Sequence, residues 1–224
     1  MANDDIKACI DIVPPPRSRD ERMALITAAK WQPGDKIVVA FMDGDVALRE
    51  RVKNEALVWT EYANLNVFFL QDPAADVRIS FKYKGSWSHI GTTCRNVPAD
   101  EPTMNFGWLR PESSEDEVAR VVLHEFGHAL GCIHEHNHPE AGIKWNKQAV
   151  YDYFTGPPNN WTKDQIDQNL FATYDKTLTV YSTVDPASIM MYPIDARFTE
   201  DGFSVGLNRQ LSAMDKDFIR KMYF

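Results

Sequence analysis

Residues 124–136 read HEFGHALGCIHEH, and three of the histidines in this stretch stand at informative spacings. His124 and His128 are four residues apart, so on a helix both imidazole rings lie on one face and can reach a single ion. Glu125 lies one step round the same helix, where its carboxylate can reach a metal-bound water without being a ligand. The stretch therefore predicts a metal site with a base beside it.

A third histidine, His134, follows Gly131 by three residues. A continued helix would carry His134 about 600° past His128, off the ligand face. A glycine can take the positive φ that turns the chain back towards the metal. Three neutral imidazoles leave one zinc position for water, which is typical of a catalytic site. We expect one Zn²⁺ bound by His124, His128 and His134, with Glu125 as the general base for the zinc-bound water.

A metal-free polar patch is the plain alternative for these histidines. The full pattern, HExxHxxGxxH, arises by chance on the order of once in 10⁵ chains at average residue usage. A buried glutamate without a partner would also be costly. We therefore favour the metal site.

The sequence marks the surrounding helix at both ends. Ser114 and Glu117 form a capping-box pattern, acidic residues fill the first turn, and Gly131 is expected to end the helix. Apolar residues on most sides predict a buried, central helix; they are Val118, Val121, Val122, Leu123, Phe126, Ala129 and Leu130.

Upstream of this helix, strands alternate with another helix. Asp45 is expected to cap a helix that runs to about Tyr62 and buries one face. The order of elements predicts an α+β fold with a mixed sheet. The expected strands cover residues 37–41, 66–71, 77–82 and 103–109. Residues 103–108 are expected to form a strand of the sheet, and the same strand can also be an edge strand that pairs with extended substrate.

Downstream, the chain is rich in loops. Short helices are expected near residues 147–154 and after Thr162, and a last helix starts at Ser212, with Asp215 three residues on. Residues 1–30 read as an irregular, pro-like lead, because three consecutive prolines block regular structure. We expect a lead (residues 1–30) followed by a catalytic domain (residues 31–224).

The chain has three cysteines, and one of them lies in the lead. A thiolate at Cys9 can occupy the open zinc position and keep an enzyme latent, although the motif of matrixin prosegments is missing around it. The alternative is an unremarkable cysteine in a flexible arm. Cys94 and Cys132 can form a disulfide or remain thiols, because sequence alone does not pair them.

Residues 124–136 resemble the metzincin signature, and specifically that of astacin-like peptidases, in which a glutamate follows the third histidine as Glu135 does here. Residues 188–192 (SIMMY) resemble the methionine turn of the same family. By this likeness Met190 forms the floor beneath zinc. Tyr192 would bind zinc at rest and swing to stabilise the oxyanion. Core filler and a half-buried tyrosine are the plain alternatives for these two residues.

The resemblance implies a two-lobed, zincin-like metzincin fold. Residues 31–134 would form a lobe with a twisted mixed sheet and two long helices, and residues 135–224 an irregular lobe with a terminal helix. Three residues depart from the family pattern: Cys132 stands where phenylalanine is usual, His138 where arginine is, and Met191 where histidine is. None of them removes a zinc ligand or the base, so a divergent relative is expected.

The resemblance implies a zinc metalloendopeptidase that hydrolyses internal bonds of protein or peptide substrates. One rival is a zinc-retaining, non-catalytic binding or toxin module, and another is a zinc hydrolase of non-peptide bonds. His89, His136 and His138 are not expected to be ligands: His89 reads as a strand or loop residue, and the other two as residues on the surface or around the ligands.

Composition limits the partners. A net charge of −8 argues against nucleic acid, and no apolar run reaches the ~18 residues of a membrane span. A monomer is expected. The family resemblance implies secretion, whereas the first residues lack a classical signal peptide, which leaves a cytoplasmic location or non-classical export as alternatives.

Overall fold

The computed structural model describes residue 9 and residues 29–138, 140–173 and 184–224. The strands are β1 (Lys36–Phe41), β2 (Asn66–Phe69), β3 (Val77–Ser80), β4 (Ser86–Ser88) and β5 (Met104–Phe106). The helices are α2 (Val46–Leu57), α3 (Glu115–Ala129), α4 (Lys147–Phe154), α5 (Lys163–Ile166) and α6 (Ala213–Tyr223). Short 3₁₀ turns are η1 (Val58–Glu61), η2 (Gly91–Asn96), η3 (Glu135–Asn137) and η5 (Ala196–Phe198), and η4 (Asp167–Phe171) is a π turn.

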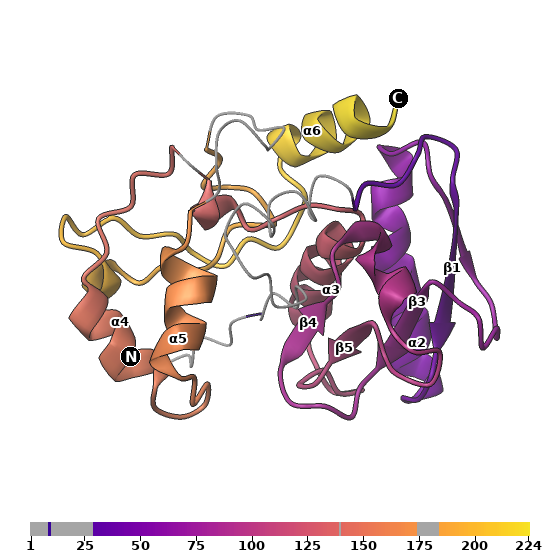
Figure 1. Ribbon diagram of the computed structural model, residues 1–224, viewed down its shortest axis with the longest axis horizontal. Helices are drawn as coiled ribbons and strands as arrows, with labels where there is room; N and C mark the ends of the chain where they lie inside the picture. The colour runs from indigo at the N-terminus through magenta and orange to yellow at the C-terminus, as the bar shows by residue number, and fades with distance from the viewer. Residues whose placement is uncertain (1–8, 10–28, 139, 174–183) are drawn as a thin grey trace.

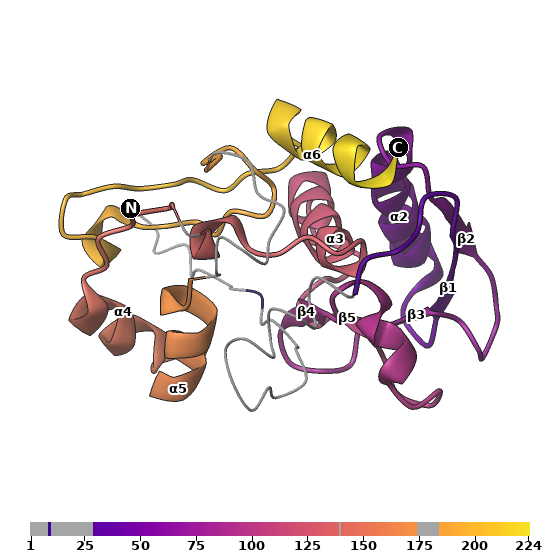
Figure 2. The ribbon, with the colours of Figure 1, turned by 45° about the horizontal axis from the view of Figure 1, so that its top comes forward.

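Two halves lie side by side, one with the sheet, α2 and α3 and the other with α4 and α5 (Figure 1). The last helix, α6, lies over the first half (Figure 2), where the hydroxyl of Tyr223 donates to the carbonyl of Leu130 at 2.5 Å. Apart from residues 9, 29 and 30, the predicted lead lies outside the described residues.

The described residues form a five-stranded sheet in the order β2-β1-β3-β5-β4. The first three pairings are parallel, and the register pairs Lys36 with Asn66 and Val39 with Val77. Strand β4 runs antiparallel to β5, so the sheet is mixed. The predicted α+β class with a mixed sheet and two long helices is confirmed.

The prediction that residues 103–108 form an edge strand is wrong. Strand β5 is paired on both sides, by β3 and by β4, so it is not an edge strand. The edge on this side of the sheet is β4, which the sequence did not predict, and β2 forms the other edge. Strand β4 has only three residues, which is too few to show an alternating pattern, and it follows the polar stretch Lys82-Tyr83-Lys84-Gly85.

The capping predictions for α2 are confirmed. The side chain of Asp45 accepts hydrogen bonds from the amides of Ala47 and Leu48 at 2.8 and 3.2 Å, which satisfies donors that have no partner inside the helix. The α-helix ends at Leu57 and continues as the 3₁₀ turn η1. The buried face predicted for this helix packs against α3.

Helix α3 starts and stops where the sequence indicated. The hydroxyl of Ser114 accepts from the amide of Glu117 at 3.2 Å. At the other end Gly131 has φ +98°, its amide donates to His128, and the amide of Cys132 donates to Gly127. This pair of bonds is a Schellman motif, which needs a residue with positive φ at the position of the glycine.

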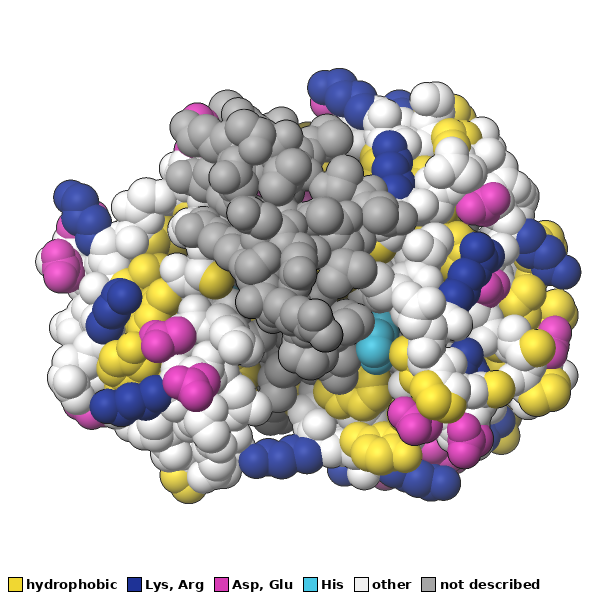
Figure 3. Space-filling model, in the orientation of Figure 1, with side chains coloured by type: hydrophobic (Ala, Val, Ile, Leu, Met, Phe, Trp, Pro, Cys, Tyr) yellow, Lys and Arg dark blue, Asp and Glu magenta, His cyan; other side chains and the backbone are white. Residues whose placement is uncertain are grey.

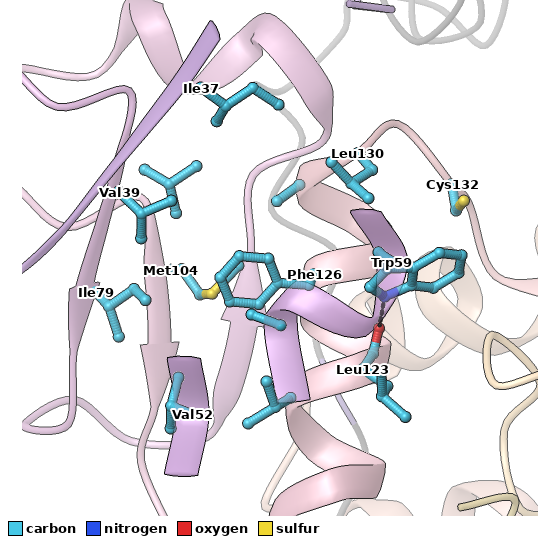
Figure 4. Close-up of a cluster of buried hydrophobic side chains, with 14 of the residues drawn as sticks. Ile37, Val39, Val52, Trp59, Ile79, Met104, Leu123, Phe126, Leu130 and Cys132 are labelled. Atoms are coloured by element: carbon cyan, nitrogen blue, oxygen red, sulfur yellow. Dashed lines mark hydrogen bonds between the residues drawn. The ribbon is translucent and has the colours of Figure 1, made fainter. Parts of the chain in front are cut away.

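The main core lies between the sheet and the two long helices (Figure 4). Phe126 points from α3 towards Met104 of β5, and the indole nitrogen of Trp59 donates to the carbonyl of Leu123 at 2.9 Å. Trp59 is 1% exposed. Truncating a buried aromatic of this kind costs about 3–5 kcal/mol, so the core fixes the position of α3 against the sheet.

The second half has a smaller core of its own. Predicted residues 147–154 form α4, and Thr162 caps α5 with a complete capping box, so both predictions are confirmed. The predicted last helix is confirmed as well, with Ser212 and Asp215 as its capping box. The buried residues of this core are Cys9, Val150, Phe154, Trp161, Ile166, Leu170, Tyr192 and Phe198.

No helix among the described residues is both long and apolar enough to span a membrane. On the face shown in Figure 3, basic and acidic side chains are interspersed over both halves of the molecule.

His89, which follows β4, makes stability depend on pH. Burial, and then the charge of Arg78, lower its pKa from 6.5 to about 4. Below pH 6.5 the unfolded chain therefore binds a proton that the folded chain does not, and stability falls until about pH 4. Between pH 7 and pH 4, His89 is expected to lower the free energy of unfolding of the wild type by about 3 kcal/mol. In His89→Gln this contribution should be absent.

Urea titrations of both proteins at several pH values measure this difference. Carboxylates also titrate between pH 7 and pH 4, but the wild type and the variant have the same carboxylates. Their contribution to the free energy of unfolding therefore cancels in the difference between the two proteins. Parallel stability curves for the two proteins would contradict the assignment to His89.

Candidate metal and active site

Helix α3 carries the first half of the site. His124 and His128 are one turn apart and are 8% and 0% exposed, and Glu125 between them is 1% exposed. Burial of three polar side chains lowers the stability of the fold unless each of them has a binding partner. The predicted arrangement of these three residues on one helix is what the structure has.

His134 returns to the same point after the turn at Gly131. Its Nε2 lies 3.1 Å from Nε2 of His124 and 3.1 Å from Nε2 of His128. Ligands 2.0–2.1 Å from a tetrahedral zinc ion lie about 3.3 Å from one another. The three nitrogens therefore fit a single zinc ion, and their convergence is hard to explain by hydrogen bonding alone.

The remaining ring nitrogens of two histidines are held by backbone carbonyls. Nδ1 of His124 lies 2.8 Å from the carbonyl of Ile189, and Nδ1 of His128 lies 2.9 Å from that of Cys132. Such contacts fix the tautomer that leaves Nε2 free to bind metal. Burial, followed by the neighbouring His128 and His134, lowers the pKa of His124, which favours the neutral form that a metal requires.

Residues 188–192, predicted to form the methionine turn, contact the helix that carries His124 and His128. A Cβ atom on Gly127 would come within 2.3 Å of the sulfur of Met190, so these two residues pack in direct contact. The carboxylate of Asp215 accepts from the Ser188 hydroxyl at 2.6 Å and from the Ile189 amide at 2.8 Å. Asp215, which completes the capping box of α6 with Ser212, thereby also holds this turn, a contact that the sequence did not predict.

Glu135, next to the third histidine, ties two loops together. Its carboxylate accepts from the amide of Asp185 at 2.8 Å, and its own amide donates to the carbonyl of Met190 at 3.0 Å. Burial raises its pKa to about 7. This residue fixes the loop that carries Met190 relative to the loop that carries His134.

Tyr192 lies against the histidine cluster. Its ring centre is 4.3 Å from that of His134 and 4.3 Å from that of His136. Its hydroxyl donates a hydrogen bond to the carbonyl of Cys9. The side chain is 3% exposed.

Cys9 lies inside the site, although it precedes Glu125 by 116 residues in the sequence. Its sulfur lies 3.1 Å from Oε2 of Glu125. The sulfur and the ligand nitrogens of His124, His128 and His134 all lie within 4.8 Å of one another. The structure thus brings the one thiol of the lead to the proposed metal position.

The other two cysteines lie outside the group of residues that could hold a metal. All three cysteines of the chain are described and buried, and no disulfide joins them. A bridge between Cys94 and Cys132 is therefore not formed. Cys132 fills part of the main core, in agreement with a packing role at this departure from the family pattern.

The neighbouring histidines are buried but lie outside the ligand cluster. Nε2 of His136 lies 2.7 Å from the carbonyl of Asn169, and Nδ1 of His138 accepts from the amide of Glu140 at 2.9 Å. They are 2% and 6% exposed, so the prediction that they are not ligands agrees with their placement. A surface position for them is wrong, because the loop is covered by η4 and its neighbours.

A pocket opens beside Glu125, and sequence reasoning missed one of its walls. Its lining includes Arg120, one helical turn before His124, together with Trp108 and Leu207. The spacing of four residues to His124 is the signal that could have identified Arg120. Met191 and Tyr192 of the methionine turn line the same pocket.

Comparisons with known proteins agree with this geometry. The family model of the astacin peptidases matches residues 26–224. A structure of myroilysin is 46% identical, has a TM-score of 0.86 and covers 88% of this chain and 97% of that chain. A crystal structure of myroilysin is 42% identical, with a TM-score of 0.73, and covers 100% of this chain and 93% of that chain.

A more distant structure shows the same fold. High choriolytic enzyme 1, a hatching enzyme zinc-protease from the medaka fish Oryzias latipes, is 16% identical, with a TM-score of 0.63 and coverage of 88% and 95% of the two chains. No curated protein sequence matches the chain. The convergent histidines, the methionine turn and the family match together establish that this chain belongs to the astacin family of zinc metallopeptidases.

Proposed function

We propose that the chain is a zinc-dependent endopeptidase whose metal is held by His124, His128 and His134. The convergence of the three Nε2 atoms, 3.1 Å apart in two pairs, carries this proposal. Bound zinc would acidify a water molecule and polarise the carbonyl of the scissile bond. The division of the catalytic domain into lobes at residue 134 is part of the same proposal.

Glu125 is proposed to act as general base and then as general acid. Its carboxylate lies beside the three imidazoles and takes the proton of the attacking water. The same carboxyl group passes this proton to the amine that leaves. Burial of Glu125 supports the role, because a desolvated carboxylate is a stronger base than one in water.

Tyr192 is proposed to stabilise the charge that develops on the carbonyl oxygen. Its ring lies 4.3 Å from that of His134, so the phenol can approach the reacting carbonyl by a side-chain rotation. A hydroxyl donor aimed at an oxyanion typically contributes 10²–10³-fold in rate. Met190 is proposed to support the ligand histidines through its contact with Gly127.

Cys9 is proposed to keep the full chain latent. Its thiol donates a hydrogen bond to the carboxylate of Glu125, and its backbone carbonyl accepts one from the hydroxyl of Tyr192. One residue of the lead therefore engages both proposed catalytic groups. A thiolate is also a zinc ligand and would take the position that water needs. Removal of the lead would then release the site.

The direct test uses unfolded casein and the chain after removal of its lead. Hydrolysis is expected, and a chelator of divalent metals should abolish it until zinc is restored. A zinc-retaining module without activity would bind zinc and leave casein intact, which would overturn the proposal. Products cut at internal bonds, identified by mass spectrometry, distinguish an endopeptidase from a hydrolase of other bonds.

We also propose an extracellular location. The astacin-like pattern of residues 124–136 and 188–192 supports it. Detection of the protein in culture medium, free of cytoplasmic marker proteins, is the measurement that checks this location.

A further inference from the structure

The C-terminal end of α3 has two buried carbonyl groups that the helix itself leaves unpaired. The Schellman motif uses the carbonyls of Gly127 and His128. The next two carbonyls, those of Ala129 and Leu130, accept no backbone amide from the part of the chain that the structure describes. Both residues are buried, at 4% and 3% exposure, and a buried carbonyl without a partner is costly. The end of α3 therefore needs donors from elsewhere in the chain.

Two aromatic side chains, from the two ends of the predicted catalytic domain, supply these donors. The indole nitrogen of Trp31 donates to the carbonyl of Ala129 at 2.8 Å. The hydroxyl of Tyr223 donates to the carbonyl of Leu130 at 2.5 Å. Both aromatic residues are 0% exposed, so water does not compete for either bond. The two side chains together cap the end of the helix that carries His124 and His128.

The two donors are held in place by their own neighbours. The guanidinium of Arg95 lies 4.7 Å from the ring centre of Trp31 and is itself paired with Asp76 at 2.9 Å. The ammonium group of Lys30 lies 5.5 Å from the ring centre of Tyr223. Burial raises the pKa of Tyr223, so its hydroxyl stays protonated and remains a donor. A hydrogen bond from the backbone of Trp31 to Tyr223 links the two donors directly.

The turn that follows these carbonyls controls two of the three proposed zinc ligands. His134 follows Gly131 by three residues, so the direction of the chain at this glycine decides where the imidazole arrives. A Cβ atom on Gly131 would lie 3.4 Å from the hydroxyl of Tyr223, which therefore packs against the turn. The carbonyl of Cys132, in the same turn, lies 2.9 Å from Nδ1 of His128. A shift of the turn would move one ligand and rotate the other.

We propose that Trp31 and Tyr223 are positioning residues for the zinc ligands. The proposed zinc site, on which this inference rests, needs three imidazoles in one fixed arrangement. The two caps hold the end of α3, so the turn at Gly131 brings His134 to the metal position without a search among conformations. Ligands that are already fixed lose less freedom on binding, which strengthens binding. Groups that orient metal ligands from outside typically contribute about 10- to 100-fold in affinity.

The experiment measures the dissociation constant of zinc by competition with a chromophoric chelator. The parent is the metal-free full chain with Cys9→Ala, because a thiolate at Cys9 would itself bind zinc. Trp31→Phe and Tyr223→Phe each remove one donor and keep an aromatic ring. We expect each substitution to raise the Kd for zinc at least about tenfold. Tyr223→Phe removes a single oxygen atom, so it tests the inference even where Trp31→Phe does not fold.

Two substitutions of the same kind are the matched controls. Trp59 is 1% exposed, and its indole nitrogen donates to the carbonyl of Leu123 within α3 rather than at its end (Figure 4). The hydroxyl of Tyr151 donates to Asp167 in the second half of the molecule. Trp59→Phe and Tyr151→Phe should therefore leave the Kd of the parent unchanged.

Urea unfolding of the metal-free proteins separates positioning from a purely structural role. A purely structural role would lower the free energy of unfolding of Tyr223→Phe and leave the Kd of the folded protein at the value of the parent, which would overturn the inference. The absorption bands of Co²⁺ bound in place of zinc report the arrangement of the ligands. These bands should change in Tyr223→Phe and stay the same in Tyr151→Phe.

The outcome for the two aromatic residues is independent of the peptidase activity. A parent that binds zinc but leaves casein intact would overturn the proposed activity, and the ratios of Kd would still decide the role of Trp31 and Tyr223. Equal Kd values for the parent, Trp31→Phe and Tyr223→Phe would overturn that role and leave the proposed activity standing.

Discussion

Replacing Glu125 by alanine is expected to lower kcat/KM for peptide hydrolysis by about 10²–10⁴-fold, the range that a positioned general base contributes. The three imidazoles that converge on the metal position are unchanged in this variant, so the zinc content should remain one ion per chain. Glu125→Gln tests the same point with less change in volume, because an amide cannot accept the proton. Casein hydrolysis by lead-free protein and elemental analysis measure the two properties.

A second glutamate of the same helix is the control for this substitution. Glu115 lies in the first turn of α3, where its side chain is exposed and pairs with Arg51. Glu115→Gln should leave kcat/KM unchanged and should alter stability by less than about 1 kcal/mol. Wild-type activity in Glu125→Ala would remove Glu125 from the mechanism, and loss of zinc in that variant would mean that the carboxylate is a ligand.

The full chain with Cys9→Ala is expected to hydrolyse casein on the order of 10²-fold faster than the full wild-type chain. A segment tethered to the same chain has an effective concentration in the millimolar range, so it competes strongly with substrate for the site. Removal of the sulfur leaves Glu125 accessible and takes away a thiolate that would bind zinc. Rates measured on both proteins before and after removal of the lead separate the effect of the thiol from that of the rest of the lead.

Cys94→Ala is the control for the thiol. Burial raises the pKa of Cys94 to about 12, and this residue lies in η2, away from the histidines. This variant should remain as latent as the wild type. Equal rates for the wild type and Cys9→Ala in the full chain would show that the thiol does not restrain the enzyme.

The centre of the site could be predicted from sequence because its parts are close in the chain and depend on local geometry. His124, Glu125 and His128 share one helix, and the helix period alone places them together. Gly131 lies where the chain must take positive φ, and its Schellman motif confirms the turn. Helix caps such as Ser114 and Asp45 are likewise local, so the starts of α2 and α3 followed from the sequence, whereas α2 ends at Leu57, earlier than the predicted end near Tyr62.

Pairing across the sheet was harder to predict. Strand β4 has three residues and no alternating pattern, and its neighbour β5 was therefore considered as an edge. Which strand lies at the edge depends on which segments meet in space. Hydrogen bonds between strands distant in sequence decide this, and no period along the chain records them.

The sequence by itself determined the zinc-binding pattern, the base beside it and the helix that holds both, because bond geometry and helix periodicity act over a few residues. Only the tertiary structure decided that Cys9 reaches Glu125, that Asp215 holds the methionine turn and that Arg120 lines the pocket. These contacts join segments up to 116 residues apart, and they form because burial of the two cores brings the segments together.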